Sequence, residues 1–402
     1  MGNLLVAQSG GPSAVINASL AGIIEGALGK VPKILGGVHG IKGVLEEDFI
    51  DLSERFSDKA ALDLLAHTPA AYLGTCRYKL PKDDEAIYQK LFDIFAKHDI
   101  EFFIYIGGND SMDTVDKLSK FGARIGSNVK IVGAAKTIDN DLALTDHTPG
   151  FGSAAKYVAT SMREIILDCK SFDRNALTVV EIMGRNAGWL TAAAALARTE
   201  QIGEPDFIYL PEVPFDLNKA IADIIAKFEE KPCVIVAISE GVRTAEGKFI
   251  FEYCDGEVKR DAFGHALLSG TALSLCNLVK NKMDVKTRAI EFSLLQRCAG
   301  HLQSLTDATE AREAGRMTAE AALAGDSAVM VGYKRVSNSP YKIEFAKFPV
   351  SEIANHEKGV PREWINDAGN DVLAPLVEYI APLIAGENPP VFVDGLPQYA
   401  IR

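Results

Sequence analysis

Short apolar runs that end in glycine or a polar residue recur along the chain, and each has the length of a buried strand. The runs are Leu4–Gln8, Phe102–Gly107, Val129–Ala135, Leu177–Met183, Val234–Ser239 and Ala328–Tyr333. Segments with helical periodicity separate them: Ala14–Leu28, Ser111–Phe121, Gly152–Leu167, Gly188–Arg198, Leu217–Glu229, Ala266–Lys280 and Asp307–Ala324. Because strands that alternate with helices are typical of parallel sheets covered on both faces, we predict an α/β fold.

No Ser/Gly linker, charge block or repeat divides the chain, so only the alternation of predicted strands and helices indicates its domains. We expect one α/β domain over residues 1–150 plus about 298–340, and a second over 151–297. The stretch from Pro340 to Arg402 is richer in Pro and Glu, and its segment Asp371–Ala385 predicts one more helix. We assign residues from about 341 to 402 to the second domain as a C-terminal appendage.

The composition is that of a soluble globular protein, with 24% charged and 48% hydrophobic residues among 402. A net charge of -12 disfavours nucleic acid and anionic membranes as partners, so any anionic substrate requires a local basic pocket. The apolar run Leu4–Ala7 is too short for a signal peptide or a membrane span. The six cysteines form no C-x-x-C pair, which predicts reduced thiols in a cytoplasmic protein.

Two glycine-containing loops follow predicted strands and precede predicted helices. Ser9-Gly10-Gly11 lets backbone N–H groups and a helix N-terminus approach a phosphate, although paired glycines there are equally typical of tight packing. Gly107-Gly108-Asn109-Asp110-Ser111 is either a turn in which Asp110 or Ser111 caps the helix, or a ligand site. In the second interpretation Asp110 holds Mg²⁺ or excludes a bulkier ligand.

Two further loops carry charged residues after predicted strands. Lys136-Thr137-Ile138-Asp139-Asn140-Asp141 combines a cation for phosphate with two carboxylates, one of them a candidate base, although such loops are usually solvated turns. Met183-Gly184-Arg185 places a guanidinium where it would bind a sugar or phosphate oxygen, or form a structural ion pair. Glu240, Arg288 and Arg297 indicate no function by themselves.

Several common ligand motifs are absent from the sequence. There is no G-x-x-x-x-G-K-[ST] and no G-x-G-x-x-G after the first strand, which argues against a P-loop kinase and a dinucleotide site. No H-E-x-x-H or other zinc spacing occurs among the seven histidines. Phosphate chemistry supported by carboxylates and Mg²⁺ is the interpretation that remains.

Taken in order, the segments SGGPSAVINAS, LGTCR, IGGNDS, KTIDND, TPGFGSA, VEIMGR, SEG, TRA and LQR resemble the phosphofructokinase family. They span residues 9–297, and the ordered set is far more specific than any single member. The resemblance implies two similar three-layer α/β domains with mainly parallel sheets and an active site in the cleft between them. It also implies Mg²⁺-dependent phosphoryl transfer to the 1-hydroxyl of fructose 6-phosphate, a step of glycolysis.

The resemblance assigns roles to individual residues. Gly11 and Arg77 match phosphate-binding positions, Asp139 matches the general base, Thr137 lies beside the transferred phosphate, and Asp141 supports the loop. Residues that match the sugar-phosphate site are Met183, Gly184, Arg185, Glu240, Arg288 and Arg297. Such a set supplies the positioning and charge neutralisation that phosphoryl transfer requires.

The phosphoryl donor is indicated by two substitutions. ATP-using members typically carry glycine where this chain has Asp110 and Lys136, and small residues there leave room for the nucleotide. A carboxylate and a lysine at these positions resemble the pyrophosphate-dependent branch, which implies a reversible reaction. An ATP-dependent kinase and a non-catalytic sugar-phosphate-binding paralogue are the alternatives, and the intact Asp139 argues against the second.

The chain departs from the family pattern in three places. Asn109 replaces a metal-binding Asp, so either Asp110 takes over the Mg²⁺ contact or the metal is held mainly by pyrophosphate. Leu294 replaces an aromatic or His near the sugar phosphate. Ala176 stands where ATP-using members carry an arginine that reaches a neighbouring subunit, a role for which Arg174 and Arg163 are candidates. The resemblance implies a homodimer or homotetramer.

Overall fold

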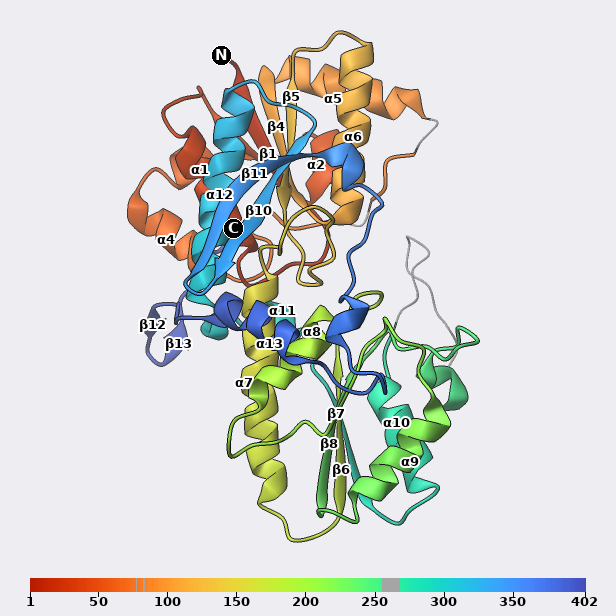
Figure 1. The fold of residues 1–402 in the computed structure, drawn as a ribbon. Helices are drawn as coiled ribbons and strands as arrows, with labels where there is room; N and C mark the ends of the chain where they lie inside the picture. The colour runs from red at the N-terminus through yellow and green to blue at the C-terminus, as the bar shows by residue number, and fades with distance from the viewer. Residues whose placement is uncertain (77, 82–83, 255–267) are drawn as a thin grey trace. The chain divides into compact units, whose positions relative to one another are not determined.

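The computed structural model describes residues 1–76, 78–81, 84–254 and 268–402, and the chain forms two compact units (Figure 1). Unit 1 contains Met1–Ser153, Arg297–Glu357 and Leu383–Arg402. Unit 2 contains Ala154–Gln296 and Lys358–Pro382. In the described part of the chain, no helix combines the length and the apolar character that a bilayer crossing requires.

Unit 1 is built on a seven-stranded sheet in the order β11-β10-β5-β4-β1-β2-β3. The strands are β1 (Asn3–Gln8), β2 (Ile34–Gly37), β3 (Phe49–Asp51), β4 (Ile100–Gly107), β5 (Lys130–Ala135), β10 (Val329–Asn338) and β11 (Tyr341–Pro349). The five inner strands are parallel, whereas β3 and β11 run antiparallel at the two edges.

Helices cover both faces of this sheet, as Figure 1 shows for α1 and α12 on one side and α5 and α6 on the other. The helices are α1 (Ile16–Ala27), α2 (Gly40–Leu45), α3 (Leu52–Arg55), α4 (Lys59–His67), α5 (Glu85–Lys97), α6 (Asn109–Arg124) and α12 (Leu305–Leu323). Along β1, Leu4 and Val6 pack into the core under α1 and α12, while Leu5 and Ala7 pack into the core with α5 and α6. Burial on both faces explains the unbroken apolar run.

Unit 2 is built on a four-stranded parallel sheet in the order β7-β8-β6-β9. The strands are β6 (Ala176–Ile182), β7 (Phe207–Tyr209), β8 (Cys233–Ser239) and β9 (Lys286–Glu291). The helices are α7 (Phe151–Lys170), α8 (Trp189–Ala192), α9 (Leu217–Lys227), α10 (Thr271–Lys280) and α13 (Ala374–Ile380). Figure 1 shows α9 and α10 on one face of this sheet and α7 on the other.

The remaining elements are short. The chain passes from unit 2 to unit 1 within a single turn, α11 (Leu295–Cys298), and the strands β12 (Phe392–Val393) and β13 (Leu396–Pro397) form a small hairpin in unit 1. Short 3₁₀ turns occupy Ala193–Ala197, Ile250–Cys254, Gly300–Leu302, Val350–Glu352, Arg362–Trp364 and Ala381–Ile384.

The six predicted strands are confirmed, and two expectations need correction. The periodic segment 188–198 forms only one α-helical turn, α8, followed by a 3₁₀ turn. In the stretch 341–402, only residues 358–382 lie in unit 2. Residues 341–349 form β11, which pairs with β10 from Val329↔Pro349 to Asn338↔Tyr341 and covers the edge of the unit 1 sheet.

Candidate active site

Three of the predicted loops come together in unit 1. They follow β1, β4 and β5, which are neighbouring parallel strands, so their carboxyl ends meet at one edge of the sheet. The backbone N–H of Ser9 donates to the carbonyl of Ile106 (2.8 Å), and that of Lys136 donates to the carbonyl of Gly107 (3.0 Å). The three loops therefore lie beside one another at this edge of the unit 1 sheet.

Lys136 is the buried cation of this site. Its side chain is only 3% exposed, and its Nζ donates to the carbonyl oxygen of Gly11 at 2.6 Å. Burial lowers the pKa of Lys136 to about 8, against the attraction of Asp139 and Asp141 and with the repulsion of Arg297. A lysine so poorly solvated is primed to accept an anionic ligand, because an anion would replace the lost hydration.

Two charged side chains approach the Gly10-Gly11 turn closely. Gly10 has a φ of 76°, and a Cβ on it would lie 3.1 Å from Nζ of Lys136. A Cβ on Gly11 would lie 3.2 Å from Nη1 of Arg297. The arginine expected near the sugar 6-phosphate therefore lies beside the glycine loop of unit 1, where two positive side chains flank exposed backbone.

The segment Thr137–Asp141 holds two carboxylates close together. The backbone N–H of Asp139 donates to Oγ1 of Thr137 (3.1 Å), and Asn140 between the acids is buried with a φ of 54°. Burial, together with the negative charges of Asp139 and Glu357, raises the pKa of Asp141 to about 7. Asp141 therefore titrates in the range expected of a group that exchanges protons at neutral pH.

Asp110 and Asn109 lie in the first turn of α6, and their side chains have different surroundings. Asp110 is about half exposed, and its Oδ1 lies 3.3 Å from Nζ of Lys79. The amide nitrogen of Asn109 donates to the carbonyl of His356 (2.8 Å), and its amide oxygen accepts the backbone N–H of Asn355. These contacts occupy the amide of Asn109, whereas the carboxylate of Asp110 stays half exposed.

The first turn of α6 also corrects the alternative capping interpretation. Gly108 occupies the position before the helix and makes no side-chain cap, so neither Asp110 nor Ser111 serves as the N-cap. Both residues lie inside the first turn instead. The carboxylate of Asp110 therefore does not cap the helix.

Mg²⁺ fits this edge of unit 1 as an ion shared with a phosphorylated ligand. Among the described residues, no group of three or more His, Cys, Asp or Glu side chains forms a metal cluster. Mg²⁺ is commonly held by one or two carboxylates together with substrate phosphates, and it keeps several waters. Asp110 supplies one such carboxylate.

Unit 2 brings together part of the predicted sugar-phosphate set at the carboxyl ends of β6 and β8. Gly184 has a φ of 148°, and its N–H donates to Oε1 of Glu240 (3.4 Å). Its carbonyl accepts the hydroxyl of Ser239 (2.5 Å). A Cβ on Gly241 would lie 2.0 Å from the carbonyl of Arg185, which shows how closely the two loops pack. Met183 is held at its N–H by Oε1 of Gln296 (3.3 Å).

Arg288 lies elsewhere in unit 2, away from the other residues that match the sugar-phosphate site. It pairs with Thr178 in the amino half of β6, whereas Met183–Arg185 follow the carboxyl end of that strand. Its guanidinium lies 5.0 Å from the ring centre of Phe172, which precedes β6. Arg174 and Lys286 lie near the same ring, at 5.8 Å each. A basic cluster thus forms at the amino end of this sheet.

The remaining predicted residues are an exposed leucine and an arginine outside the described structure. Leu294, which follows β9, is 55% exposed and carries no polar group. Arg77 lies outside the described residues. Sequence reasoning missed Lys79, Glu357 and the Asn355–His356 contacts to Asn109, because no motif marks them.

Comparison with known proteins identifies the family. The phosphofructokinase family model matches residues 3–322, and this chain belongs to that family. A pyrophosphate--fructose 6-phosphate 1-phosphotransferase of Xanthomonas campestris pv. campestris (strain B100) is 42% identical over 99% of this chain and 95% of its own. The enzyme of the same name from Halomonas elongata is 41% identical with the same coverage.

The crystal structure of a pyrophosphate-dependent phosphofructokinase from Marinobacter aquaeolei has a TM-score of 0.88, at 37% identity over 99% of this chain and 95% of that chain. The expected fold is confirmed.

Proposed function

We propose that this chain transfers a phosphoryl group from pyrophosphate to the 1-hydroxyl of fructose 6-phosphate, giving fructose 1,6-bisphosphate and phosphate. The observation that carries the proposal is the buried Lys136 bonded to the Gly10-Gly11 turn, beside the half-exposed Asp110. The names of full-length relatives support the same donor and acceptor. The reaction breaks the phosphoanhydride bond of pyrophosphate and forms a phosphate ester on the sugar. Because the two compounds have comparable phosphoryl-transfer potential, the reaction is reversible.

We assign the donor to unit 1. The two positive side chains, Lys136 and Arg297, flank the exposed Gly11, and the backbone N–H groups of that turn would add to their field. Asp110 would hold Mg²⁺ together with pyrophosphate oxygens, and the ion would neutralise charge on the transferred group. The position of Arg297 favours a contact with the donor over the sugar 6-phosphate expected from the sequence.

We assign proton transfer to Asp139. Its carboxylate would accept the proton of the 1-hydroxyl as that oxygen attacks phosphorus and the bond to the leaving phosphate breaks. Thr137 lies beside the transferred group, and its hydroxyl accepts the N–H of Asp139, which fixes the turn that carries the base. Asp141 modulates the basicity of Asp139, because the two carboxylates interact electrostatically.

We assign the sugar phosphate to unit 2. Met183, Gly184, Arg185 and Glu240 gather at the carboxyl ends of β6 and β8, where parallel sheets bind ligands. The basic cluster of Arg288, Arg174 and Lys286 lies at the opposite end of the same strands. We therefore propose that this cluster serves the sugar-phosphate site of a second copy, so that the protein works as a homodimer or homotetramer.

A coupled assay tests the proposal. Purified protein is supplied with fructose 6-phosphate and Mg²⁺, and fructose 1,6-bisphosphate is detected through aldolase, with pyrophosphate and ATP offered separately. Turnover with pyrophosphate alone is the expected result. Turnover with ATP alone would overturn the donor assignment, and no turnover with either donor in a folded sample would overturn the reaction.

A further inference from the structure

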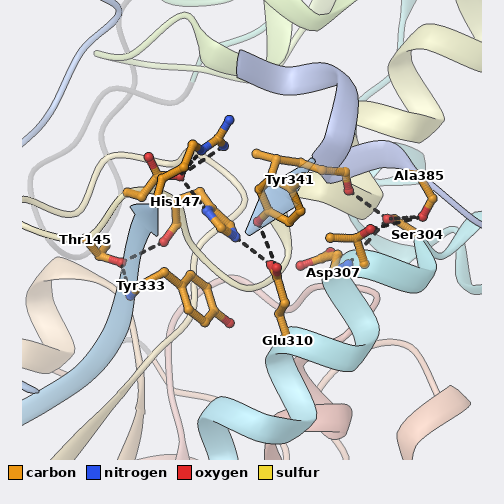
Figure 2. Close-up of polar contacts among 12 residues, drawn as sticks. Thr145, His147, Ser304, Asp307, Glu310, Tyr333, Tyr341 and Ala385 are labelled. Carbon is orange, nitrogen blue, oxygen red and sulfur yellow. Dashed lines mark hydrogen bonds and ion pairs between the residues drawn. The ribbon is translucent and has the colours of Figure 1, made fainter. Parts of the chain in front are cut away.

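A buried network of charged side chains surrounds His147 in unit 1, as Figure 2 shows. His147 is only 2% exposed, with Nδ1 at 2.8 Å from Oδ2 of Asp146 and Nε2 at 2.7 Å from Oε2 of Glu310. Neutral imidazole has one donor and one acceptor nitrogen, and an acceptor nitrogen would repel a carboxylate at this distance. The geometry therefore suits an imidazolium, in which both ring nitrogens donate.

The charge of His147 is supported from each element packed around it. Asp146 accepts Nε of Arg335 on β10 (3.0 Å), and Glu310 on α12 accepts the hydroxyl of Tyr341 on β11 through its other oxygen (2.8 Å). The ring of Tyr333 stacks on the imidazole of His147, with ring centres 4.4 Å apart. Asp307 also interacts electrostatically with His147. Burial lowers the pKa of His147, but the hydrogen bonds of the two carboxylates outweigh it and the pKa is raised overall.

The segment that contains His147 is bonded directly to the proposed catalytic loop. The hydroxyl of Thr148 donates to the carbonyl of Thr137 (2.8 Å), and Gly150 forms a parallel bridge with the same residue. The N–H of Gly150 donates to Oδ1 of Asp307 on α12 (2.9 Å). Residues 147–150 are thus fixed to α12 by Glu310 at one end and by Asp307 at the other, and they hold Thr137 between these anchors.

We infer that His147 is a positioning residue: clamped between Asp146 and Glu310, it sets the place of Thr148, which in turn fixes Thr137 and the turn that carries Asp139. This inference rests on the proposed function of that loop. His147 itself contacts no reacting group. Its replacement should therefore reduce turnover by misplacing the base, while leaving the sugar-phosphate residues of unit 2 unchanged.

The first test compares His147→Gln with Arg312→Gln. Arg312 also lies on α12 in a charged contact, with Glu25 and Asp63, but the structure gives it no bond to residues 145–150. We expect His147→Gln to lower kcat ~10- to 100-fold with the KM for fructose 6-phosphate changed less than about twofold. Arg312→Gln should leave both within about twofold, at a temperature where both variants are folded. Equal losses in the two variants would overturn the inference.

The second test addresses the link through Thr148. Thr148→Val removes the hydroxyl that holds Thr137, and Thr148→Ser keeps it, so only the valine variant should lose turnover. If His147 acts through this bond, the double variant His147→Gln with Thr148→Val should be no slower than the slower single variant. Losses that multiply would show independent roles and overturn the inference. Should His147→Gln fail to fold, the valine and serine pair still decides it: equal turnover in that pair would overturn it.

Hydrogen exchange separates this inference from the proposed reaction. Backbone amides of residues 136–150 should exchange faster in His147→Gln than in the parent protein, and remain unchanged in Arg312→Gln. That comparison needs no turnover, so a parent protein inactive with pyrophosphate would refute the proposed function without deciding the positioning role. Unchanged exchange in folded His147→Gln would refute the positioning role, whatever the donor.

Discussion

Replacing Lys136 with methionine should stabilise the protein while removing its use of pyrophosphate. Methionine has nearly the length of lysine and no charge, so it keeps the packing of a position that is 3% exposed. The substitution removes the cation proposed to bind the donor, and kcat/KM for pyrophosphate should fall by more than ~100-fold.

The size of the stability change follows from the lowered pKa of Lys136. A decrease from 10.5 to about 8, caused mainly by burial, corresponds to about 3 kcal/mol, at ~1.4 kcal/mol for each pKa unit. Below pH 8 the lysine is charged in both the folded and the unfolded chain, so the folded state bears the full cost. The variant also loses the bond to the carbonyl of Gly11, worth ~1 kcal/mol, which leaves a net gain of about 2 kcal/mol.

Urea unfolding at pH 7 and pH 10 measures this change, with Lys30→Met as the control. The side chain of Lys30 is 53% exposed, so its replacement should change the unfolding free energy by less than ~0.5 kcal/mol. The gain in Lys136→Met should shrink at pH 10, because the parent lysine is then neutral in the folded state. A loss of stability in Lys136→Met, or a gain that is equal at both pH values, would refute the reasoning.

Four further predictions concern the loops of unit 1. Asp139→Ala should lower turnover ~10²-fold or more in the coupled assay, and near-normal activity would refute its role as base. The double variant Asp110→Gly with Lys136→Gly should gain activity with ATP and lose it with pyrophosphate; continued preference for pyrophosphate would contradict the donor argument. Because the pKa of Asp141 is raised to about 7, the pH profile of kcat/KM should rise through that value, and in Asp141→Asn the rise should move to lower pH. Because the pKa of His147 is raised on folding, its contribution to stability is complete below the unfolded value of about 6.5 and is lost as pH rises through the folded value; the difference in unfolding free energy between the parent and His147→Gln should therefore shrink from pH 6 to pH 9.

The loops of unit 1 were predictable because the strands before them and the glycines within them are marked by local sequence patterns. Apolar runs identify the strands, and the glycines at their ends mark where backbone must approach a ligand or a neighbour. The bond from Lys136 to Gly11 spans 125 residues and depends on one side-chain conformation, so no local pattern indicates it. The same holds for Asn109, whose side chain bonds to Asn355 and His356. These partners lie 246 and 247 positions further along the chain.

Arg288 shows a second limit of sequence reasoning. No predicted strand covers it, and in the structure it lies on β9, where the register of that strand decides which end of the sheet it reaches. Pairing with Thr178 puts it in the amino half, beside Phe172, and away from Gly184. β11 was missed for a related reason: its alternation of exposed and half-buried residues is typical of an edge strand, and it becomes recognisable only with its partner β10.

The interleaved order of the two units bears on how the chain folds during synthesis. The sheet of unit 1 needs β10 and β11, which end at Pro349, whereas every strand of unit 2 has been made by Glu291. Helix α12, which covers the core beneath α1, is also a late element. At a synthesis rate of ~5 to 20 residues per second, roughly 10 to 40 s pass between the synthesis of residue 153 and that of the last strand of the unit 1 sheet. During synthesis the sheet of unit 2 is therefore complete while the sheet of unit 1 still has an open edge at β5, and an unpaired edge of this kind can pair with another chain.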